Sequence, residues 1–324
     1  MRKRFIVFIA MLLLLPGVFA FGAGKTTCDS TCLKNYIDRY LEAMKNDNPS
    51  LDLFTRDCKF TENGAQLPLG GQGLWYSMSG RAHYNFYVPD VETRQIAYIG
   101  TVMERDTPAR NGQPAKEHIS AVSIRLKIDD NGKICEAEQL VMRPEKKLFP
   151  EPKPAAGAPR FPPTGEAIDK MGAPNPIFNE VIPEKDRMSR EEYIRIANYY
   201  FEGLQRNDGK GYYPFTDDCV RFENGMESTK DCKKNFESVG VRGIVSSIRD
   251  RRFVAVDREH GIVFAFGFFD HVTIDWTWEI SELFKIEHGK IRRVEAAFLQ
   301  CPYGMNSGWS TYQQGRSEEI QSIR

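Results

Sequence analysis

TRDCKFTENG at residues 55–64 and TDDCVRFENG at residues 216–225 are two versions of one phrase. Their cysteines, Cys58 and Cys219, lie 161 positions apart. A repeat with so long a period is a whole domain rather than a solenoid unit, because solenoid repeats run to about 20–50 residues. The phrase therefore predicts a chain of two related domains.

The sequence around each copy extends the repeat in both directions. Upstream lie two stretches with helical spacing of apolar residues, LKNYIDRYLEAMKND (33–47) and EEYIRIANYYFEGLQRND (191–208). Downstream lie two strand-like runs that begin with a Gly-Lys-Ile turn, NGKICEAEQLV (131–141) and HGKIRRVEAAFL (288–299). Each half is therefore predicted to be an α+β unit, with a long helix followed by an antiparallel sheet.

The second half gives the clearest signals for individual elements. Ser189 and Glu192 have capping-box spacing, which predicts the start of a helix. The strand candidates of this half, separated by turn residues, are FVAVD (253–257), IVFAFGFF (262–269), WTWEISELFKI (276–286) and IRRVEAAFL (291–299).

Proline marks the predicted boundary between the domains. Ten of the eighteen prolines lie between Pro144 and Pro183, a density that excludes a helix or a central strand and favours an extended linker or a surface strap. The predicted organisation is a first domain at 28–143, a linker at 144–187, a second domain at 188–310 and a polar tail at 311–324.

The N-terminus and the charge balance bear on location and partners. Residues 1–20 have a basic start, an apolar run and small residues near Ala20, which predicts a cleavable signal peptide and a secreted or periplasmic protein; a retained signal anchor is the alternative. The 44 basic and 44 acidic residues cancel, so no nucleic-acid or membrane partner is expected after signal removal. The basic run RDRR (249–252) is interpreted as a solvated face.

All seven cysteines lie beyond the predicted signal peptide, so some disulfides are expected. Cys219 and Cys232 are predicted to pair, and Cys58 is expected to pair with Cys28 or Cys32. One thiol is left over. The spacings match no zinc ribbon and there are only five histidines, so neither a metal nor a cofactor is predicted.

The second half also resembles a known family. The phrase ENG, the run GIVFAFGFFDH (261–271), the run WTWEISELFKIEHGKIRRVEA (276–296) and PYGMNSGW (302–309) are similar to a secreted fungal and bacterial family of unknown function. That family belongs to the SnoaL-like, nuclear-transport-factor-like superfamily, and the resemblance covers nearly all of residues 28–310. It implies two tandem cone-shaped α+β barrels, each with a long helix packed in a curved sheet. The superfamily includes isomerases, cyclases, hydrolases, lyases and binding modules, so it implies a pocket but no particular reaction.

Comparison of the two halves identifies a candidate catalytic residue. When LKI (126–128) is aligned with FKI (284–286), alternation places Glu282 on an apolar, inward face where the first half has Ile124. A carboxylate in apolar surroundings has a raised pKa and can act as a general acid or base near neutrality. A salt bridge to an interior arginine such as Arg293, or a strand end near solvent, would be the structural explanations.

A second candidate is the Asp270-His271 pair at the end of a strand. A histidine oriented by a carboxylate is a common proton-transfer pair, and the first half lacks this histidine. A turn histidine that caps backbone groups is the structural alternative. The repeated Glu-Asn-Gly is interpreted as turn scaffold. Further binding residues are predicted from the cavity position of the glutamate in this turn and from the aromatic content of the second half: Glu223, Trp276, Trp278, Tyr303 and Trp309.

The function predicted from these residues is a cofactor-independent lyase, isomerase or hydrolase acting on a small apolar or aromatic molecule. In this hypothesis His271 or Glu282 moves a proton, Asp270 orients the histidine, and Trp276 and Trp278 shape the pocket. Two alternatives remain. One is a non-catalytic binding or structural module, which is compatible with a homo-oligomer. The other is a carbohydrate-active enzyme with Glu223 and Glu282 as paired carboxylates.

Overall fold

The computed structural model describes residues 28–107, 112, 114–144, 162–238 and 245–321. The predicted signal peptide at 1–20 lies outside these residues. Among the residues that are described, no helix combines the length and the apolar character needed to span a membrane.

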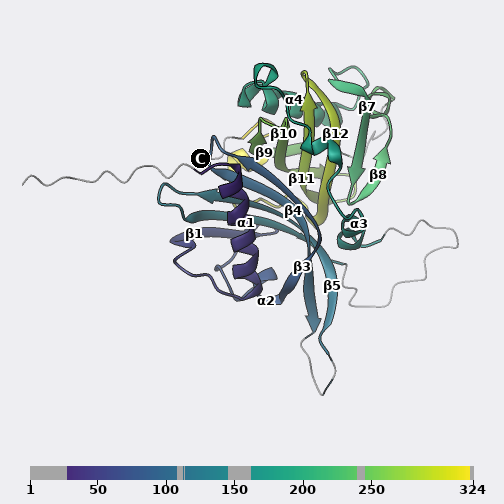
Figure 1. Cartoon of the computed structure of the whole chain (residues 1–324). Coiled ribbons are helices and arrows are strands. Elements are labelled where there is room, and N and C mark those ends of the chain that lie inside the picture. The colour runs from purple at the N-terminus through teal and green to yellow at the C-terminus, as the bar shows by residue number, and fades with distance from the viewer. Residues whose placement is uncertain (1–27, 108–111, 113, 145–161, 239–244, 322–324) are drawn as a thin grey trace, which may run out of the picture.

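The first domain is one long helix across a curved six-stranded sheet (Figure 1). The order of its strands is β2-β1-β6-β5-β4-β3. Neighbouring strands are antiparallel except β1 and β6, which are parallel, so the sheet is mixed rather than wholly antiparallel as predicted. Its elements are α1 (Ser30–Lys45), β1 (Phe54–Glu62), β2 (Ala65–Gln66), α2 (Leu74–Ser77), β3 (Met78–Asp90), β4 (Gln95–Thr107), β5 (Lys116–Ile128) and β6 (Ile134–Met142).

The second domain repeats this arrangement with the strand order β8-β7-β12-β11-β10-β9. The helix α4 starts as predicted, because Ser189 and Glu192 form a reciprocal capping box. The four predicted strands are present, each one longer than its sequence signal. The elements are α4 (Arg190–Arg206), β7 (Phe215–Glu223), β8 (Met226–Thr229), α5 (Cys232–Glu237), β9 (Ser247–Asp257), β10 (Ile262–His271), β11 (Trp276–Glu287) and β12 (Lys290–Pro302).

Both domains have the same aromatic core beneath the long helix. In the first domain the Tyr40 ring packs edge-on against Trp75, with 5.5 Å between ring centroids. The equivalent contact in the second domain joins Tyr200 and Phe236 at 5.3 Å. Trp75, which follows a glycine-rich stretch of the sequence, is buried in this core. The predicted α+β fold of two tandem cones is confirmed.

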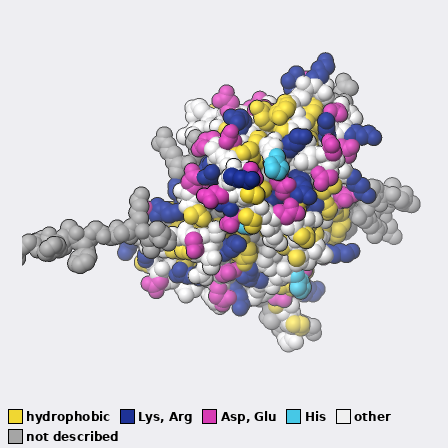
Figure 2. All heavy atoms as spheres, turned by 45° about the horizontal axis from the view of Figure 1, so that its top comes forward, with side chains coloured by type: hydrophobic (Ala, Val, Ile, Leu, Met, Phe, Trp, Pro, Cys, Tyr) yellow, Lys and Arg dark blue, Asp and Glu magenta, His cyan; other side chains and the backbone are white. Residues whose placement is uncertain are grey.

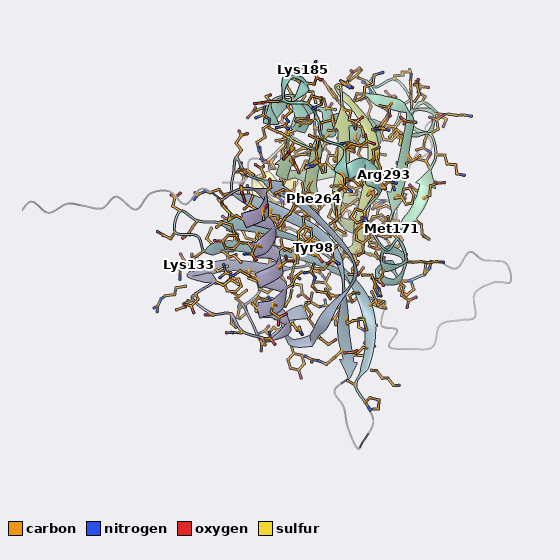
Figure 3. All side chains as sticks on the ribbon, viewed as in Figure 1. Tyr98, Lys133, Met171, Lys185, Phe264 and Arg293 are labelled. Carbon is orange, nitrogen blue, oxygen red and sulfur yellow. A yellow bond between two sulfur atoms is a disulfide. The ribbon has the colours of Figure 1, made fainter. Side chains whose placement is uncertain are left out.

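The outer faces of the two sheets pack against each other and bury a third apolar cluster, which contains Phe264 (Figure 3). At its centre the hydroxyl groups of Ser123 and Ser281 are 2.7 Å apart. These serines are equivalent positions of the repeat, since the strands align at an offset of 158. Equivalent residues meet only on a two-fold axis, so the tandem chain forms a pseudo-symmetric dimer within one polypeptide.

The basic run at 249–252 is part of this buried region, and the expectation of a solvated face is wrong. Arg252 is 2% exposed and donates to Glu138 of the first domain at 2.8 and 2.7 Å. Arg125 reaches the same carboxylate at 3.2 Å. Arg249 is also buried and pairs with Asp270 at 2.7 Å. The sequence of a charged run does not show whether water or other side chains will surround it. Here the arginines are buried and pair with carboxylates of the protein.

The predicted linker contains more structure than its prolines indicated. Residues Thr164–Lys170 form the short helix α3, followed by the 3₁₀ turns η1 (Pro176–Asn179) and η2 (Glu184–Asp186). Asp169 of α3 accepts hydrogen bonds from the Thr101 hydroxyl and the His83 backbone of the first domain. A Cβ on Gly225 of the second domain would lie 2.6 Å from the backbone of α3. The helix is therefore wedged against both domains, and the prolines flank it instead of preventing it.

The cysteine predictions are partly corrected. Cys28 and Cys32 form a disulfide with each other, so the expected bond from Cys58 to either of them is wrong. The sulfur atoms of Cys219 and Cys232 lie 2.7 Å apart as free thiols.

The predicted polar tail also contributes to the fold. It contains the helix α6 (Tyr312–Arg316), and Ile320 forms a β-bridge with Arg251. Figure 2 shows a face on which acidic and basic side chains are interspersed, as the zero net charge predicts.

Candidate functional site

The second domain has a cavity of about 130 Å³ between α4 and the inner face of its sheet. Most of its wall is apolar, with a small polar group at one side. We call it the second-domain cavity. Four charged or hydroxyl-bearing side chains and the indole of one tryptophan line it, among the residues Tyr200, Leu204, Arg221, Glu223, Val245, Phe269, Trp278, Ile280, Glu282, Ala296 and Phe298.

Glu282 is the most unusual group in this cavity. It is fully buried on β11, and the Tyr200 hydroxyl approaches its carboxyl group as a donor without reaching full hydrogen-bond geometry. Burial raises the pKa of Glu282 to about 8, although the Tyr200 hydroxyl and the Arg221 guanidinium oppose this shift. A carboxyl group with this pKa is mostly protonated at pH 7 and exchanges its proton near neutrality.

Three side chains surround this carboxyl group from α4 and β7. Burial, followed by the negative charge of Glu282, raises the pKa of the Tyr200 hydroxyl well above its ordinary value, so the phenol remains a proton-bearing donor. Arg221 is buried and pairs with Glu223 at 3.2 Å. Its Nε also donates to the Ser228 hydroxyl at 3.1 Å, which fixes the guanidinium beside the cavity.

In the first domain, hydrogen-bonded side chains occupy the equivalent region. There the Tyr40 hydroxyl donates to Gln139, which donates to Glu62. Glu62 also pairs with Arg143 at 2.7 Å, so its carboxylate is satisfied. In the second domain Ala296 faces Glu223 where Gln139 faces Glu62, and the shorter side chain leaves space.

Two further replacements put charge into that space. Phe60 and Ile124 are buried core residues of the first domain, and their equivalents are Arg221 and Glu282. A buried charge is costly, and the first domain folds with apolar residues at both positions. These charges are therefore not required by the fold. The replacement of Phe60 by Arg221 can be read from the repeated phrase, in which KFTE (59–62) corresponds to VRFE (220–223). Arg221 and Tyr200 were nevertheless not among the residues predicted from the sequence.

The structure separates the other predicted catalytic pair. Asp270 accepts hydrogen bonds from Arg249 and from the Thr277 hydroxyl, both at 2.7 Å. Successive side chains of a strand point to opposite faces, so Asp270 faces away from the ring of His271. The prediction that Asp270 orients His271 is wrong. The ring of His271 is buried beside Trp278, with 4.3 Å between centroids, and burial lowers its pKa.

The predicted binding residues fall into three places. Trp278 and Glu223 line the second-domain cavity, and Trp276 lines a groove between the domains. Trp309 packs on the first domain, where its Nε1 donates to Thr61 and the Lys59 and Arg125 side chains stack over its ring. Tyr303 is 44% exposed. The segment around Trp309 therefore joins the domains, and Trp309 does not line the second-domain cavity.

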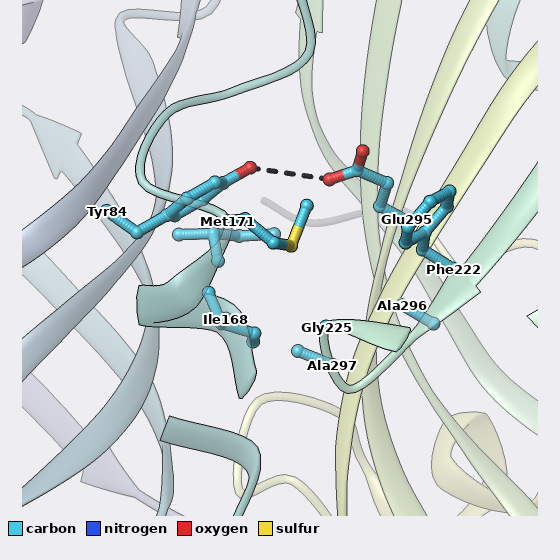
Figure 4. Close-up of a pocket in the computed structure, with 9 residues that line it drawn as sticks. Tyr84, Ile168, Met171, Phe222, Gly225, Glu295, Ala296 and Ala297 are labelled. Atoms are coloured by element: carbon cyan, nitrogen blue, oxygen red, sulfur yellow. Dashed lines mark hydrogen bonds between the residues drawn. The ribbon is translucent and has the colours of Figure 1, made fainter. Parts of the chain in front are cut away.

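A separate small cavity of about 20 Å³ lies between the domains (Figure 4). The Tyr84 hydroxyl of β3 donates to Glu295 of β12 across it at 3.3 Å. Its volume suits at most one water molecule. Burial raises the pKa of Glu295, while Arg293 lowers it. This contact belongs to the interface and not to a substrate site.

Among the described residues, no group of three or more His, Cys, Asp or Glu side chains has the arrangement to hold a metal ion. The chemistry available to the second-domain cavity is therefore argued from its carboxyl, phenol and guanidinium groups.

Comparisons with known proteins add limited information. Residues 186–298, nearly all of the second domain, match the family model described as a domain of unknown function (DUF8021). No curated protein matches the chain. Whether the chain is secreted, and from which kind of organism its relatives come, stays a prediction.

Solved structures match over about one domain of this chain. An LEH-like epoxide hydrolase of M. tuberculosis is 15% identical, with 34% of this chain and 84% of that chain covered and a TM-score of 0.29. AclR, a putative hydroxylase from Streptomyces galilaeus, is 14% identical, with 35% and 80% covered and a TM-score of 0.27. An NTF-2 like protein of unknown function from Burkholderia xenovorans LB400 is 15% identical, with 38% and 96% covered and a TM-score of 0.27. These likenesses carry no argument about the reaction.

Proposed function

We propose that the second-domain cavity catalyses a cofactor-independent proton transfer, as a lyase, isomerase or hydrolase, on a small apolar or aromatic molecule. One observation carries the proposal: Glu282 is a fully buried carboxyl group beside Tyr200 and Arg221 in a cavity, at a position where the sister domain has isoleucine. A strongly perturbed pKa in a group that lines a cavity makes that group a candidate for function.

The cavity groups divide the chemistry between them. With a pKa of about 8, Glu282 is mostly in its acid form at pH 7 and can donate its proton to a substrate oxygen. The Tyr200 phenol and the Arg221 guanidinium lie beside it as further donors, and they stabilise negative charge that develops on that oxygen. The proton that the substrate or an attacking water loses passes to solvent, and a proton taken up from solvent restores the acid form of Glu282, so the cycle has no net change in protons.

The size and polarity of the cavity limit the substrate. An apolar cavity of roughly 150 Å³ takes up benzene, so a cavity of about 130 Å³ accommodates a single small ring. Its aromatic walls at Phe269, Trp278 and Phe298 favour an apolar or aromatic ring. A hydrated sugar ring is a poorer match, and Glu223 is engaged by Arg221. Both points favour proton transfer over glycoside cleavage.

The proposal is tested with Glu282→Gln against Glu279→Gln. Both glutamates are buried on β11 with a pKa raised to about 8, but Glu279 is on the opposite face, near Glu138 and Arg252. The wild type is incubated with a panel of small aromatic alcohols, ketones and epoxides, and turnover is followed by NMR. We expect Glu282→Gln to reduce turnover by about 10²-fold or more, while Glu279→Gln retains it.

A second variant separates catalysis from binding. Ala296→Gln restores the residue of the first domain and fills part of the cavity, so it should abolish binding of these compounds without removing any charge. If the compounds bind and Ala296→Gln prevents this, but no compound turns over, the alternative of a non-catalytic binding module is favoured. Turnover that survives Glu282→Gln would refute the assignment of Glu282.

A further inference from the structure

A larger groove lies next to the second-domain cavity. It has a volume of about 720 Å³, which is within the range of small-molecule sites. One wall is formed by the ends of β1 and β6 of the first domain, including Asn63 and Arg143. The other wall is formed by Trp276 at the start of β11 and by the end of β12. We call it the interdomain groove.

Aromatic side chains lie between this groove and the cavity. Phe298 lines both spaces. Its ring lies 4.8 Å from that of Trp278, which is part of the cavity wall. The ring of His271 lies 4.3 Å from Trp278 and 6.2 Å from Trp276, which lines the groove. The two spaces are therefore neighbours along one aromatic surface.

The groove differs from the cavity in its polar groups. Arg143 is partly exposed there, and its charge is neutralised by Glu62 and Glu104, each at 2.7 Å. It therefore offers N–H donors without a net attraction for anions. The Nε1 of Trp276 is buried and has no hydrogen-bond partner in the described part of the chain. The Trp276 nitrogen is closed to the groove, so the donors that a ligand meets there are the N–H groups of Arg143, which neutral oxygen acceptors would satisfy.

We propose that the interdomain groove binds the polar, hydroxyl- or carbonyl-bearing part of a neutral molecule whose ring enters the second-domain cavity. This rests on the proposed function of the cavity, and it assigns the substrate class: a small ring with an uncharged polar substituent too large for 130 Å³. The first domain then supplies one wall of the site. The site is incomplete in the second domain alone, which gives the tandem arrangement a functional role.

The test compares two probes, phenol and phenyl β-D-glucoside, which share the ring and differ in the polar part. Gln300 lines the groove and is exposed, so Gln300→Trp obstructs the groove without disturbing the core. Gln313→Trp on α6 is the matched control, since Gln313 is exposed and does not line the groove. Dissociation constants are measured by NMR titration, with the melting temperature as a check on folding.

The wild type should bind the glucoside at least about tenfold more tightly than phenol. Gln300→Trp should remove this advantage and leave phenol binding unchanged, whereas Gln313→Trp should change neither. Equal affinities for the two probes, insensitive to Gln300→Trp, would overturn the groove proposal and leave the cavity standing. Glucoside binding that Gln300→Trp abolishes and Ala296→Gln does not would uphold the groove and reject the cavity. If neither probe binds, both proposals fail.

Discussion

At the scale of single residues, the two domains differ around the second-domain cavity, at positions where the fold does not require the residues found in the second domain. Phe60, Ile124 and Gln139 fill the first domain, and Arg221, Glu282 and Ala296 replace them in the second. Each replacement either adds a buried charge or removes volume. Both changes reduce stability, so their joint presence around one cavity indicates that they were selected for something other than folding.

The free-energy cost of burying the charged form of Glu282 predicts that stability depends on pH. The pKa of Glu282 is about 8 in the folded protein and close to 4.5 when unfolded. The folded state therefore holds this proton more tightly, and the stability it confers is complete below about pH 4.5 and lost as the pH rises through 8. We expect Glu282→Gln to increase the free energy of unfolding at pH 9 by up to about 5 kcal/mol, at about 1.4 kcal/mol for each pKa unit between the folded and unfolded values. Near pH 4 the variant should match the wild type.

Denaturant unfolding at both pH values measures this difference. Glu279→Gln provides the comparison, because its pKa is raised in the same way at a position outside the cavity. A gain for Glu282→Gln that is the same at pH 4 and pH 9 would show that the carboxyl group is not held protonated by burial.

At the scale of elements, the short helix α5 determines the position of the cavity wall. Its Phe236 packs against Tyr200, and its first residue, Cys232, lies against Cys219 of β7. The sulfur separation of 2.7 Å is close to the bond length of about 2.0 Å. The pairing predicted from sequence thus agrees with the position of the two thiols, although the structure has them reduced.

We expect Cys219 and Cys232 to form a disulfide when the folded protein is exposed to glutathione disulfide. Two thiol–disulfide exchanges form the bond, reduce glutathione disulfide to two glutathione thiols and leave the protein two hydrogen atoms lighter. Peptide mapping without reduction should recover the linked peptides. The double variant Cys219→Ser/Cys232→Ser should lose about 3 kcal/mol relative to the oxidised protein, because a disulfide that closes a loop of about 15 residues restricts the unfolded chain by that amount.

Cys58→Ser is the control, since Cys58 is the repeat equivalent of Cys219 and has no equivalent of Cys232. Alkylation of both Cys219 and Cys232 after this treatment, in the unfolded and unreduced protein, would contradict the prediction.

At the scale of the whole molecule, the pseudo-two-fold interface makes the domains interdependent. Its apolar cluster surrounds the contact between Ser123 and Ser281, and the Arg252–Glu138 pair crosses it in full burial. Removal of one partner leaves a buried charge with incomplete compensation. We expect Arg252→Gln to lower the free energy of unfolding by about 3 kcal/mol and to loosen the contact between the domains.

Chemical denaturation monitored by tryptophan fluorescence tests this expectation. Two transitions in the variant, where the wild type shows one, would indicate that the domains have become independent. Lys45→Gln is a suitable control because Lys45 pairs with Glu42 in an exposed position on α1, where ion pairs contribute little. An Arg252→Gln protein as stable as this control would show that the interface ion pair is not needed.

Local patterns in the sequence determined the elements and their repetition. Helical spacing, the capping box at Ser189 and alternation along the strands depend on neighbouring residues, and the repeated phrase made two similar domains necessary. Alternation also placed Glu282 on the inner face and marked it as different from Ile124. These features are encoded over short distances, so they can be read without a structure.

Tertiary structure alone decided which long-range partners each side chain has. In the folded protein Asp270 pairs with Arg249 instead of His271, and the basic run at 249–252 is buried with Arg252 paired to Glu138. Cys28 forms its disulfide with Cys32. It also brought Arg221 and Tyr200 to Glu282 and set the first domain beside the cavity. The physical reason is that burial and electrostatic pairing depend on distances between residues that are far apart in the chain. The repeated phrase indicates how each domain folds, but it does not indicate which residues of the two folded domains come into contact.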